Sequence, residues 1–400
     1  MLKFLKTNRF VIILTIILLV SFLIRIWQLG RIGELIFDEV YFVNFARNYL
    51  SGISFFDIHP PLGKLLIALP IKFFGDASFT WRIAPAIFGT LLILVGYLTG
   101  KEISNRTTGI FVALIMALDG MLLVYSRVGL IDMFLVFFVL LSFYLFLKFA
   151  HTKKLVFLIL AGIALGLCAS IKYVGALTLL SFVFIIIAEK IPLRKNMIKF
   201  IIFLGVVPLA IYITFFLFNL SPNRTFFQEL LLWHKQSFNY NIYLTDDHPY
   251  ASKWWSWFLL LRPIWLFFKD IDGRFVGIDG IGNPLAWWSF VAVIPLFIWG
   301  AWKGDKNNLI ILGSFFIFWF FWAFFKRVLF LYHALPSFTF LVLGTALLLE
   351  KLLKIPYGKY YVITYFILLF CLFLFFLPIW LGLPIETNSF YHRIWLRGWI

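Results

Sequence analysis

Two adjacent carboxylates, Asp38 and Glu39, follow the first long apolar run of the chain. On a helix, neighbouring side chains point about 100° apart, so one carboxylate can face a reacting centre while the other supports it. A carboxylate in that position suits the work of a general base. The alternative is structural, because Asp38 could cap the following helix by accepting backbone N–H hydrogen bonds. Both interpretations stay open at this point.

A second polar group lies further along the same segment, in the stretch Phe-Phe-Asp-Ile-His-Pro-Pro that contains Asp57 and His59. A carboxylate and an imidazole so close together can handle a proton. Asp and Pro also favour surface turns, and a turn is the structural alternative here.

Positive charges occur at helix ends where membrane orientation alone does not place them. They are Arg82, Arg127, Lys172 and the pair Lys326-Arg327. Cations at membrane depth are costly unless they are paired or hydrated, so they usually face the interior of a helix bundle. Each could instead extend to the lipid headgroups. Because several separate helix ends carry such a cation, one shared anion site is the favoured interpretation.

Asp119 and Asp132 flank Arg127 within or at the ends of apolar runs. Carboxylates inside a membrane are functional by default, although ion pairs with Arg127 are an equal alternative. The histidines are too scattered for a zinc site. Cys168 and Cys371 both fall in apolar runs, so we expect small buried side chains rather than a disulfide pair or a metal site. We therefore predict no metal and no cofactor, with a carboxylate-bound divalent ion left open.

The elements that position these residues must be membrane helices. The 400 residues are 63% hydrophobic and 13% charged, which is not a soluble composition. Apolar runs of about 20 residues recur along the chain and are apolar on nearly every face, which favours helices over a β-barrel. We predict an all-α polytopic membrane protein with eleven spans, over residues 9–29, 82–100, 108–125, 129–149, 155–171, 173–189, 199–219, 285–302, 308–325, 328–349 and 358–381.

The charges predict the orientation of this bundle. Residues 1–29 have a basic start and lack a convincing cleavage site, so we expect a retained first span with a cytoplasmic N-terminus. Short segments on that side then carry many of the cations, in agreement with the positive-inside rule. This topology explains the net charge of +17 without a nucleic-acid partner. Most carboxylates, including Asp246 and Asp247, lie at or near the outer face.

Two outer segments are long enough to hold a site, residues 30–81 and 220–284. The first should contain two short surface helices, Asp38 to Leu50 and a second that begins at Pro61. The second is rich in tryptophan around residues 254–265, which predicts an interfacial helix at headgroup level. We divide the chain into an N-terminal module, 1–219, with the catalytic segment 30–81, and a C-terminal module, 220–400.

Together these residues describe an outer-facing pocket with carboxylates for proton transfer and cations for a phosphate. A transferase that uses a lipid-phosphate sugar needs this combination, because a base accepts the proton of the acceptor hydroxyl and fixed cations stabilise the departing phosphate. A transporter or lipid flippase is the non-enzyme alternative. It would need polar residues along a path across the bilayer, whereas here they gather on one side.

At these residues the chain resembles the protein O-mannosyltransferases, the polyprenyl-phosphate-mannose-dependent branch of the GT-C glycosyltransferases. Seven blocks carry the resemblance, in family order and over roughly residues 37–284. They are Phe-Asp-Glu-Val-Tyr-Phe from Phe37, Phe-Phe-Asp-Ile-His-Pro-Pro-Leu-Gly-Lys from Phe55, Ala-Leu-Asp from Ala117, Ser-Arg-Val-Gly-Leu-Ile-Asp-Met-Phe from Ser126, Ser-Ile-Lys-Tyr-Val-Gly from Ser170, His-Pro-Tyr-Ala-Ser-Lys-Trp-Trp-Ser-Trp from His248, and Gly-Asn-Pro from Gly282.

The resemblance implies a GT-C bundle in the cell membrane and an inverting transfer of mannose from a polyprenyl phosphate to Ser or Thr hydroxyls of exported polypeptides. It implies Asp38 as the catalytic base with Glu39 beside it. The candidate donor-binding residues are Arg127, Lys172, Arg82, Asp57 and His59, and the candidate supporting residues are Asp119, Asp132, His248 and Lys253. Another polyprenyl-phosphate sugar, or a lipid or envelope-glycan acceptor, is the enzymatic alternative. The oligomeric state stays open.

Overall fold

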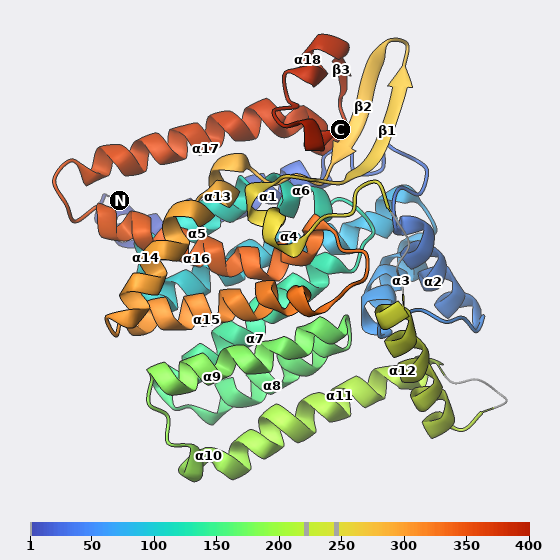
Figure 1. Cartoon of the computed structure of the whole chain (residues 1–400), viewed down its shortest axis with the longest axis horizontal. Coiled ribbons are helices and arrows are strands. Elements are labelled where there is room, and N and C mark those ends of the chain that lie inside the picture. Colours follow the sequence, from blue (N-terminus) through green and yellow to red (C-terminus); the bar gives the residue numbers. More distant parts are fainter. Residues whose placement is uncertain (1, 220–223, 244–247) are drawn as a thin grey trace.

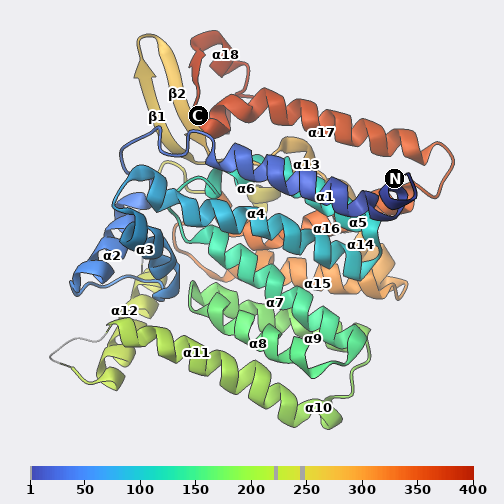
Figure 2. The ribbon, with the colours of Figure 1, turned by 180° about the vertical axis from the view of Figure 1, so that it is seen from behind.

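The computed structural model describes residues 2–219, 224–243 and 248–400, so Asp246 and Asp247 lie outside the described part. Long helices dominate this part and pack side by side into one bundle (Figure 1). A small sheet and the helices of the segment 30–81 lie toward one end of the bundle, as Figure 2 shows from behind.

The elements between Leu2 and Asn219 are all helical. They are α1 (Leu2–Ile26), α2 (Glu39–Ser51), α3 (Leu62–Phe74), α4 (Ser78–Ile103), α5 (Arg106–Ala117), α6 (Gly120–Tyr125), α7 (Asp132–Thr152), α8 (Leu155–Ala169), η1 (Tyr173–Leu177), α9 (Thr178–Ala188), α10 (Leu193–Phe200), η2 (Ile201–Val206), α11 (Val207–Phe216) and η3 (Leu217–Asn219).

The remaining elements mix helices with three strands. They are α12 (Phe226–Tyr243), η4 (Trp254–Leu259), β1 (Trp265–Ile271), β2 (Arg274–Asp279), α13 (Pro284–Trp288), α14 (Phe290–Trp302), α15 (Lys306–Phe320), η5 (Phe321–Phe324), η6 (Leu331–Ala334), α16 (Leu335–Leu352), α17 (Gly358–Leu381), β3 (Pro384–Glu386), α18 (Thr387–Tyr391) and η7 (Arg397–Trp399).

Eight helical segments of the described part are long and apolar enough to cross a membrane. They are Arg9–Ile26, Ser78–Ile103, Asp132–Thr152, Leu193–Asn219, Pro284–Trp302, Lys306–Phe324, Leu331–Leu352 and Gly358–Leu381. Three shorter apolar helices take the places of the third, fifth and sixth predicted spans, and they are Arg106–Ala117, Leu155–Ala169 and Tyr173–Ala188. The fold is therefore that of a multi-span membrane protein, with α7 and α16 mostly buried in the bundle and α1, α11 and α17 at its edges.

The third predicted span, 108–125, is two helices rather than one. Helix α5 ends at Ala117 and α6 begins at Gly120, with Asp119 between them. The Asp119 side chain accepts a hydrogen bond from the backbone N–H of Leu122 at 2.9 Å and so caps α6. The break follows from the preference of Asp for the N-cap position over a helix interior.

The segment 30–81 contains the two predicted surface helices, α2 and α3, and Pro61 is the N-cap of α3. The first turn of α3 is pressed against the bundle. A Cβ added to Gly63 would come within 2.7 Å of the Ile131 side chain, and the Leu62 backbone N–H donates to the Ser170 carbonyl at 3.0 Å. These contacts fix the segment against the ends of α7 and α8.

The predicted interfacial helix around residues 254–265 is wrong. The chain instead forms the short 3-10 helix η4 and then an antiparallel hairpin of β1 and β2, to which β3 adds a third strand. The turn residues Asp272 and Gly273 both have positive φ, 52° and 75°, as a tight two-residue hairpin requires. The tryptophans face the interior more than the periphery, because Trp257 and Trp265 are buried.

Candidate active site

Asp38 stands directly before α2, after Phe37, whose backbone has a φ of 47°. Within the described part its side chain makes no cap hydrogen bond, so the capping interpretation does not apply. The pKa of the Asp38 carboxyl is raised to about 6, mainly by burial. This value includes smaller effects of nearby charges, because Lys172 lowers the pKa while Asp132 and Asp57 raise it. The carboxyl is therefore mostly ionised at neutral pH and its oxygens are available to accept a proton.

Glu39 is fully buried and both of its oxygens are engaged. The Arg82 guanidinium donates to them from Nε and Nη2, each at 2.7 Å, and the backbone N–H groups of Gly129 and Ile36 donate at 2.6 and 3.0 Å. The rest of the Arg82 guanidinium donates to the backbone carbonyls of Leu29, Ile32 and Glu34. Since a guanidinium has five N–H groups, Arg82 has none left for a phosphate. Glu39 and Arg82 hold the start of α2 in place.

Lys172 and Asp132 form a buried ion pair between two helix ends. Lys172 precedes η1, and its Nζ lies 2.7 Å from Oδ1 of Asp132, the first residue of α7. The same Nζ lies 5.4 Å from the centre of the Tyr332 ring, a cation–π contact that further stabilises the charge. The charges of both members affect the pKa of Asp38, so the Asp38 carboxyl and the Lys172 ammonium lie in one site.

Asp57 and His59 have different roles. Asp57 is paired with the buried Lys64 of α3, and the Lys64 Nζ also donates to the His59 backbone carbonyl at 2.6 Å. This pair closes the turn that presents the His59 imidazole, which stacks on Phe42. Burial, together with the charges of Lys172 and Lys64, holds the pKa of His59 well below its ordinary value. His59 is therefore a neutral imidazole at neutral pH.

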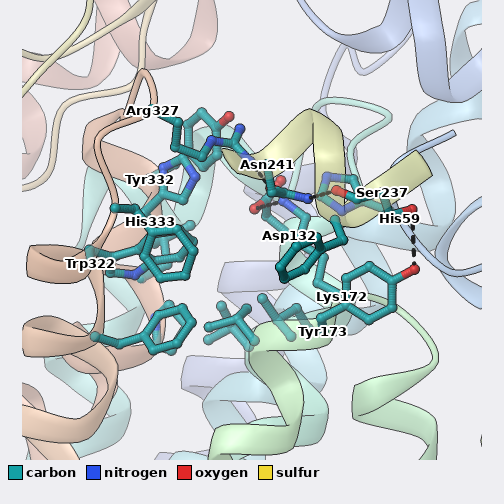
Figure 3. Close-up of a pocket in the computed structure, with 18 of the residues that line it drawn as sticks. His59, Asp132, Lys172, Tyr173, Ser237, Asn241, Trp322, Arg327, Tyr332 and His333 are labelled. Carbon is teal, nitrogen blue, oxygen red and sulfur yellow. Dashed lines mark hydrogen bonds and ion pairs between the residues drawn. The ribbon is translucent and has the colours of Figure 1, made fainter. Parts of the chain in front are cut away.

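A cavity of about 430 Å³ is enclosed by His59, Asp132 and Lys172 together with side chains from residues 234–241 and 321–336 (Figure 3). Its polar lining consists of His59, Asp132, Lys172, Tyr173, His234, Ser237, Asn241, Arg327, Tyr332 and His333. Its apolar lining includes Leu135, Val136, Phe238, Phe321, Trp322 and Phe325. Asp38 lies beside the cavity rather than in its wall. The cavity thus has a charged end and an apolar body, which suits an amphiphilic ligand with a phosphate.

The far wall of the cavity holds residues that were not chosen as site residues from the sequence. Arg327 lies between η5 and η6, and its Nη1 donates to Oδ1 of Asn241 on α12. Ser237, one turn earlier on α12, receives a hydrogen bond from the Tyr173 hydroxyl at 3.3 Å. Helix α12 thereby closes the cavity from one side (Figure 3). Arg327 was visible in the sequence as a cation at an outer helix end; the α12 residues gave no comparable signal.

Besides Asp38, Glu39, Arg82 and Asp57, four further sequence candidates do not line this cavity. Arg127 donates from Nη1 to the carbonyls of Ile24, Arg25 and Trp27 at the end of α1, and it lines a different, smaller cavity. Asp119 accepts hydrogen bonds from Leu122, Asn283 and Trp287. His248 accepts one from the Tyr250 backbone, and Lys253 is exposed. The structure therefore brings Asp38, Asp132, Lys172 and His59 together and leaves Arg127 apart from them.

Within residues 2–219, 224–243 and 248–400, no group of three or more His, Cys, Asp or Glu side chains is arranged to hold a metal ion. The positive charge of the site comes from Lys172 and Arg327. Such fixed cations can stabilise a phosphate that departs from a sugar, while a carboxylate takes a proton from an incoming hydroxyl. The arrangement therefore fits group transfer from a phosphate-linked donor.

The fold is that of the GT-C glycosyltransferases, integral membrane enzymes. ArnT from Cupriavidus metallidurans, in a structure bound to undecaprenyl phosphate, aligns with a TM-score of 0.62 at 15% identity and covers 93% of this chain and 72% of its own. The protein O-mannosyltransferase Pmt1-Pmt2 complex of S. cerevisiae, bound to the sugar donor, aligns with a TM-score of 0.86 at 17% identity, over 98% of this chain and 93% of that one.

The chain belongs to the protein O-mannosyltransferase family. The family profile described as dolichyl-phosphate-mannose-protein mannosyltransferase matches residues 15–81 and 70–221, and that of the C-terminal four-span region of protein O-mannosyltransferase matches residues 226–399. The polyprenol-phosphate-mannose–protein mannosyltransferase of Mycobacterium tuberculosis is 24% identical, over 97% of this chain and 91% of its own length. The chain is thus a membrane glycosyltransferase of this family.

Proposed function

We propose that this chain transfers mannose from a polyprenyl-phosphate-mannose donor to Ser or Thr hydroxyls of exported polypeptides. Two observations together carry the proposal. The Asp38 carboxylate, which accepts no side-chain hydrogen bond among the described residues, lies close enough to Lys172 for that charge to lower its pKa, and Lys172 and Arg327 line one cavity. Relatives over nearly the whole length of the chain carry the name of this activity, which supports the same substrates here.

In the proposed reaction the acceptor hydroxyl oxygen attacks the anomeric carbon of the sugar. The bond between that carbon and the phosphate oxygen breaks, and the polyprenyl phosphate leaves with the electron pair. Asp38 takes the hydroxyl proton as the new glycosidic bond forms. A single displacement of this kind inverts the configuration at the anomeric carbon.

The cavity supplies the remaining functions in this scheme. Lys172 and Arg327 stabilise the charge that develops on the departing phosphate, and we propose that they do so without a metal ion. The neutral His59 imidazole can bind a sugar hydroxyl without adding a competing charge. The apolar wall formed by Leu135, Val136 and Phe325 accommodates the start of the polyprenyl chain.

We also propose that the chain lies in the cell membrane with its N-terminus in the cytoplasm and the cavity at the outer face. The basic residues flanking the apolar runs on the opposite side support this orientation. The acceptor would then meet Asp38 after export.

The test is transfer by purified protein reconstituted with radiolabelled polyprenyl-phosphate-mannose and a Ser/Thr-rich peptide. We expect labelled peptide with the natural chain and none with Asp38→Asn or Asp38→Ala. Asp272→Asn, the same chemical change at the exposed hairpin turn, is the matched control and should stay active. A panel of other polyprenyl-phosphate sugars and of lipid acceptors completes the experiment. Transfer only from another sugar, or only to a lipid, would overturn the substrates proposed here.

A further inference from the structure

A second cavity, of about 20 Å³, is lined by three arginines from separate parts of the chain. Arg31 follows α1, Arg82 belongs to α4 and Arg127 precedes α7. Its other lining residues include Gln28, Ile36, Ile278 and Trp380, and none of them also lines the larger cavity. Three like charges around one small space repel one another unless an anion lies between them.

Glu39 neutralises only one member of this cluster, Arg82, which it binds through two hydrogen bonds. In the described part of the chain, neither Arg31 nor Arg127 forms an ion pair, and the nearby Asp119 carboxylate accepts hydrogen bonds from Leu122, Asn283 and Trp287 instead. Burial, together with the charges of Arg31, Arg82 and Arg25, lowers the pKa of Arg127 to about 9. The cavity therefore has an excess of positive charge.

The two unpaired arginines also have unused donors. Arg31 donates from Nη2 to the carbonyls of Leu381 and Gly382 at the end of α17. Arg127 donates from Nη1 to the carbonyls at the end of α1. No other hydrogen bond of either guanidinium occurs among the described residues, so Nε and the second Nη of each remain available. Such pairs of N–H groups match the geometry of phosphate oxygens.

We propose that this cavity binds a phosphate-type anion, from a phospholipid headgroup or from free phosphate, through the available N–H groups of Arg31 and Arg127. A space of this size holds about one oxygen, so the rest of the phosphate stays at the mouth. Trp27, at the end of α1, is 46% exposed, and tryptophan at a helix end is typical of the headgroup level. A lipid phosphate would therefore lie within reach.

The bound anion links two peripheral helices that have few direct contacts. The ends of α1 and α17 lie near the same end of the bundle (Figure 2), and Gln28 and Leu381, next to those ends, line the same small cavity. Arg127 holds the end of α1 and Arg31 holds the end of α17, so an anion shared by the two guanidinium groups stabilises both ends at once. This small cavity and the larger one have no lining residue in common. Anion binding can therefore be measured without the transfer reaction.

The test measures thermal unfolding of the purified chain in a maltoside detergent that contains no phosphate. One arm adds inorganic phosphate against chloride at equal ionic strength, and a second adds phosphatidylglycerol, with bound lipid counted by native mass spectrometry. We expect stabilisation of the natural chain and of Arg274→Gln, which removes an exposed charge from β2. Arg31→Gln should bind phosphate about tenfold more weakly, because it loses charge-assisted hydrogen bonds.

Protection by phosphatidylglycerol alone assigns the anion to a lipid, and protection by phosphate alone assigns it to a free ion; either result supports the site. The proposal is overturned if neither stabilises the natural chain, or if Arg31→Gln responds as the natural chain does. Should Arg31→Gln not fold, Arg31→Lys keeps the charge but loses the paired N–H groups. Binding by Arg31→Lys as tight as in the natural chain would then overturn the paired-donor geometry.

Discussion

Asp38 and Glu39 are neighbours in the chain, yet only Glu39 is saturated with hydrogen bonds while Asp38 makes none with its side chain in the described residues. The two carboxylates therefore divide the work. Glu39 fixes the backbone at the start of α2, and Asp38 keeps its oxygens available beside Lys172. This division predicts different outcomes for substitutions at the two positions.

The pH profile tests Asp38 as the base. Its pKa is about 6, raised mainly by burial, and the base acts in its ionised form. We expect kcat/KM to be level above about pH 7 and to fall about tenfold for each pH unit below 6. Because Lys172 lowers the pKa of Asp38, Lys172→Met should move the midpoint to higher pH. A midpoint that stays in place in Lys172→Met contradicts the electrostatic contact between the two groups.

Substitutions at Glu39 and Arg82 should lower the stability of the protein more than they affect the transfer reaction. Arg82→Leu leaves Glu39 buried without its cation, which costs about 3–5 kcal/mol. We expect a clear drop in the melting temperature, and partial recovery in the double variant Glu39→Leu/Arg82→Leu, since no buried charge then remains. Thermal unfolding in detergent measures both. Unchanged stability of Arg82→Leu, combined with a raised KM for the donor, would instead assign Arg82 to the ligand.

Lys172 should contribute to the rate of transfer through the leaving phosphate. We expect Lys172→Met to lower kcat by roughly 10²–10³, the effect typical of removing one group that stabilises a developing anion. Lys172→Arg should retain part of the activity, since it keeps the charge. Lys269→Met, which removes an exposed lysine paired with Glu34, is the control and should be neutral. Single-turnover kinetics with a saturating donor separate this effect from binding.

Asn241 should act through Arg327. Its Oδ1 accepts a hydrogen bond from Arg327 Nη1, and both residues line the cavity. We expect Asn241→Leu to raise the KM for the donor by about tenfold, and to have little further effect once Arg327→Gln is present. Asn239→Leu, the same chemical change at an exposed position of α12 outside the cavity lining, is the control for changes to this helix. Additive losses in Asn241→Leu/Arg327→Gln would show that Asn241 acts independently.

Much of the fold was predictable because length and polarity decide it. The apolar runs, the two helices of segment 30–81 and the start of α3 at Pro61 all follow from local sequence. The hairpin of β1 and β2 was missed, although Asp272-Gly273 between two aromatic-rich runs is a hairpin signal. The tryptophans that precede this turn are also typical of an interfacial helix, so the local sequence supports two different structures.

The site was only partly predictable, because its contacts join distant positions. Asp38 and Lys172 can be predicted as site residues because they are charged and lie next to helix ends. Nothing local distinguishes Arg127, whose donors cap α1, from Lys172, whose ammonium lines the cavity. The same holds for Arg327, which meets Asn241 across 86 positions of sequence. Which cation meets which acceptor is settled by helix packing, and packing between distant spans cannot be derived from local pattern.

The hydrogen bonds around Glu39 constrain the order in which the protein can become active. They unite the start of α2, a residue of α4 and the Gly129 backbone before α7. A nascent chain that has not yet inserted α7 possesses Asp38 but lacks the Gly129 N–H and the Asp132–Lys172 pair. With the role proposed for Asp38, we therefore expect the site to be completed late during synthesis, and the growing polypeptide to be inactive until that part of the bundle is in the bilayer.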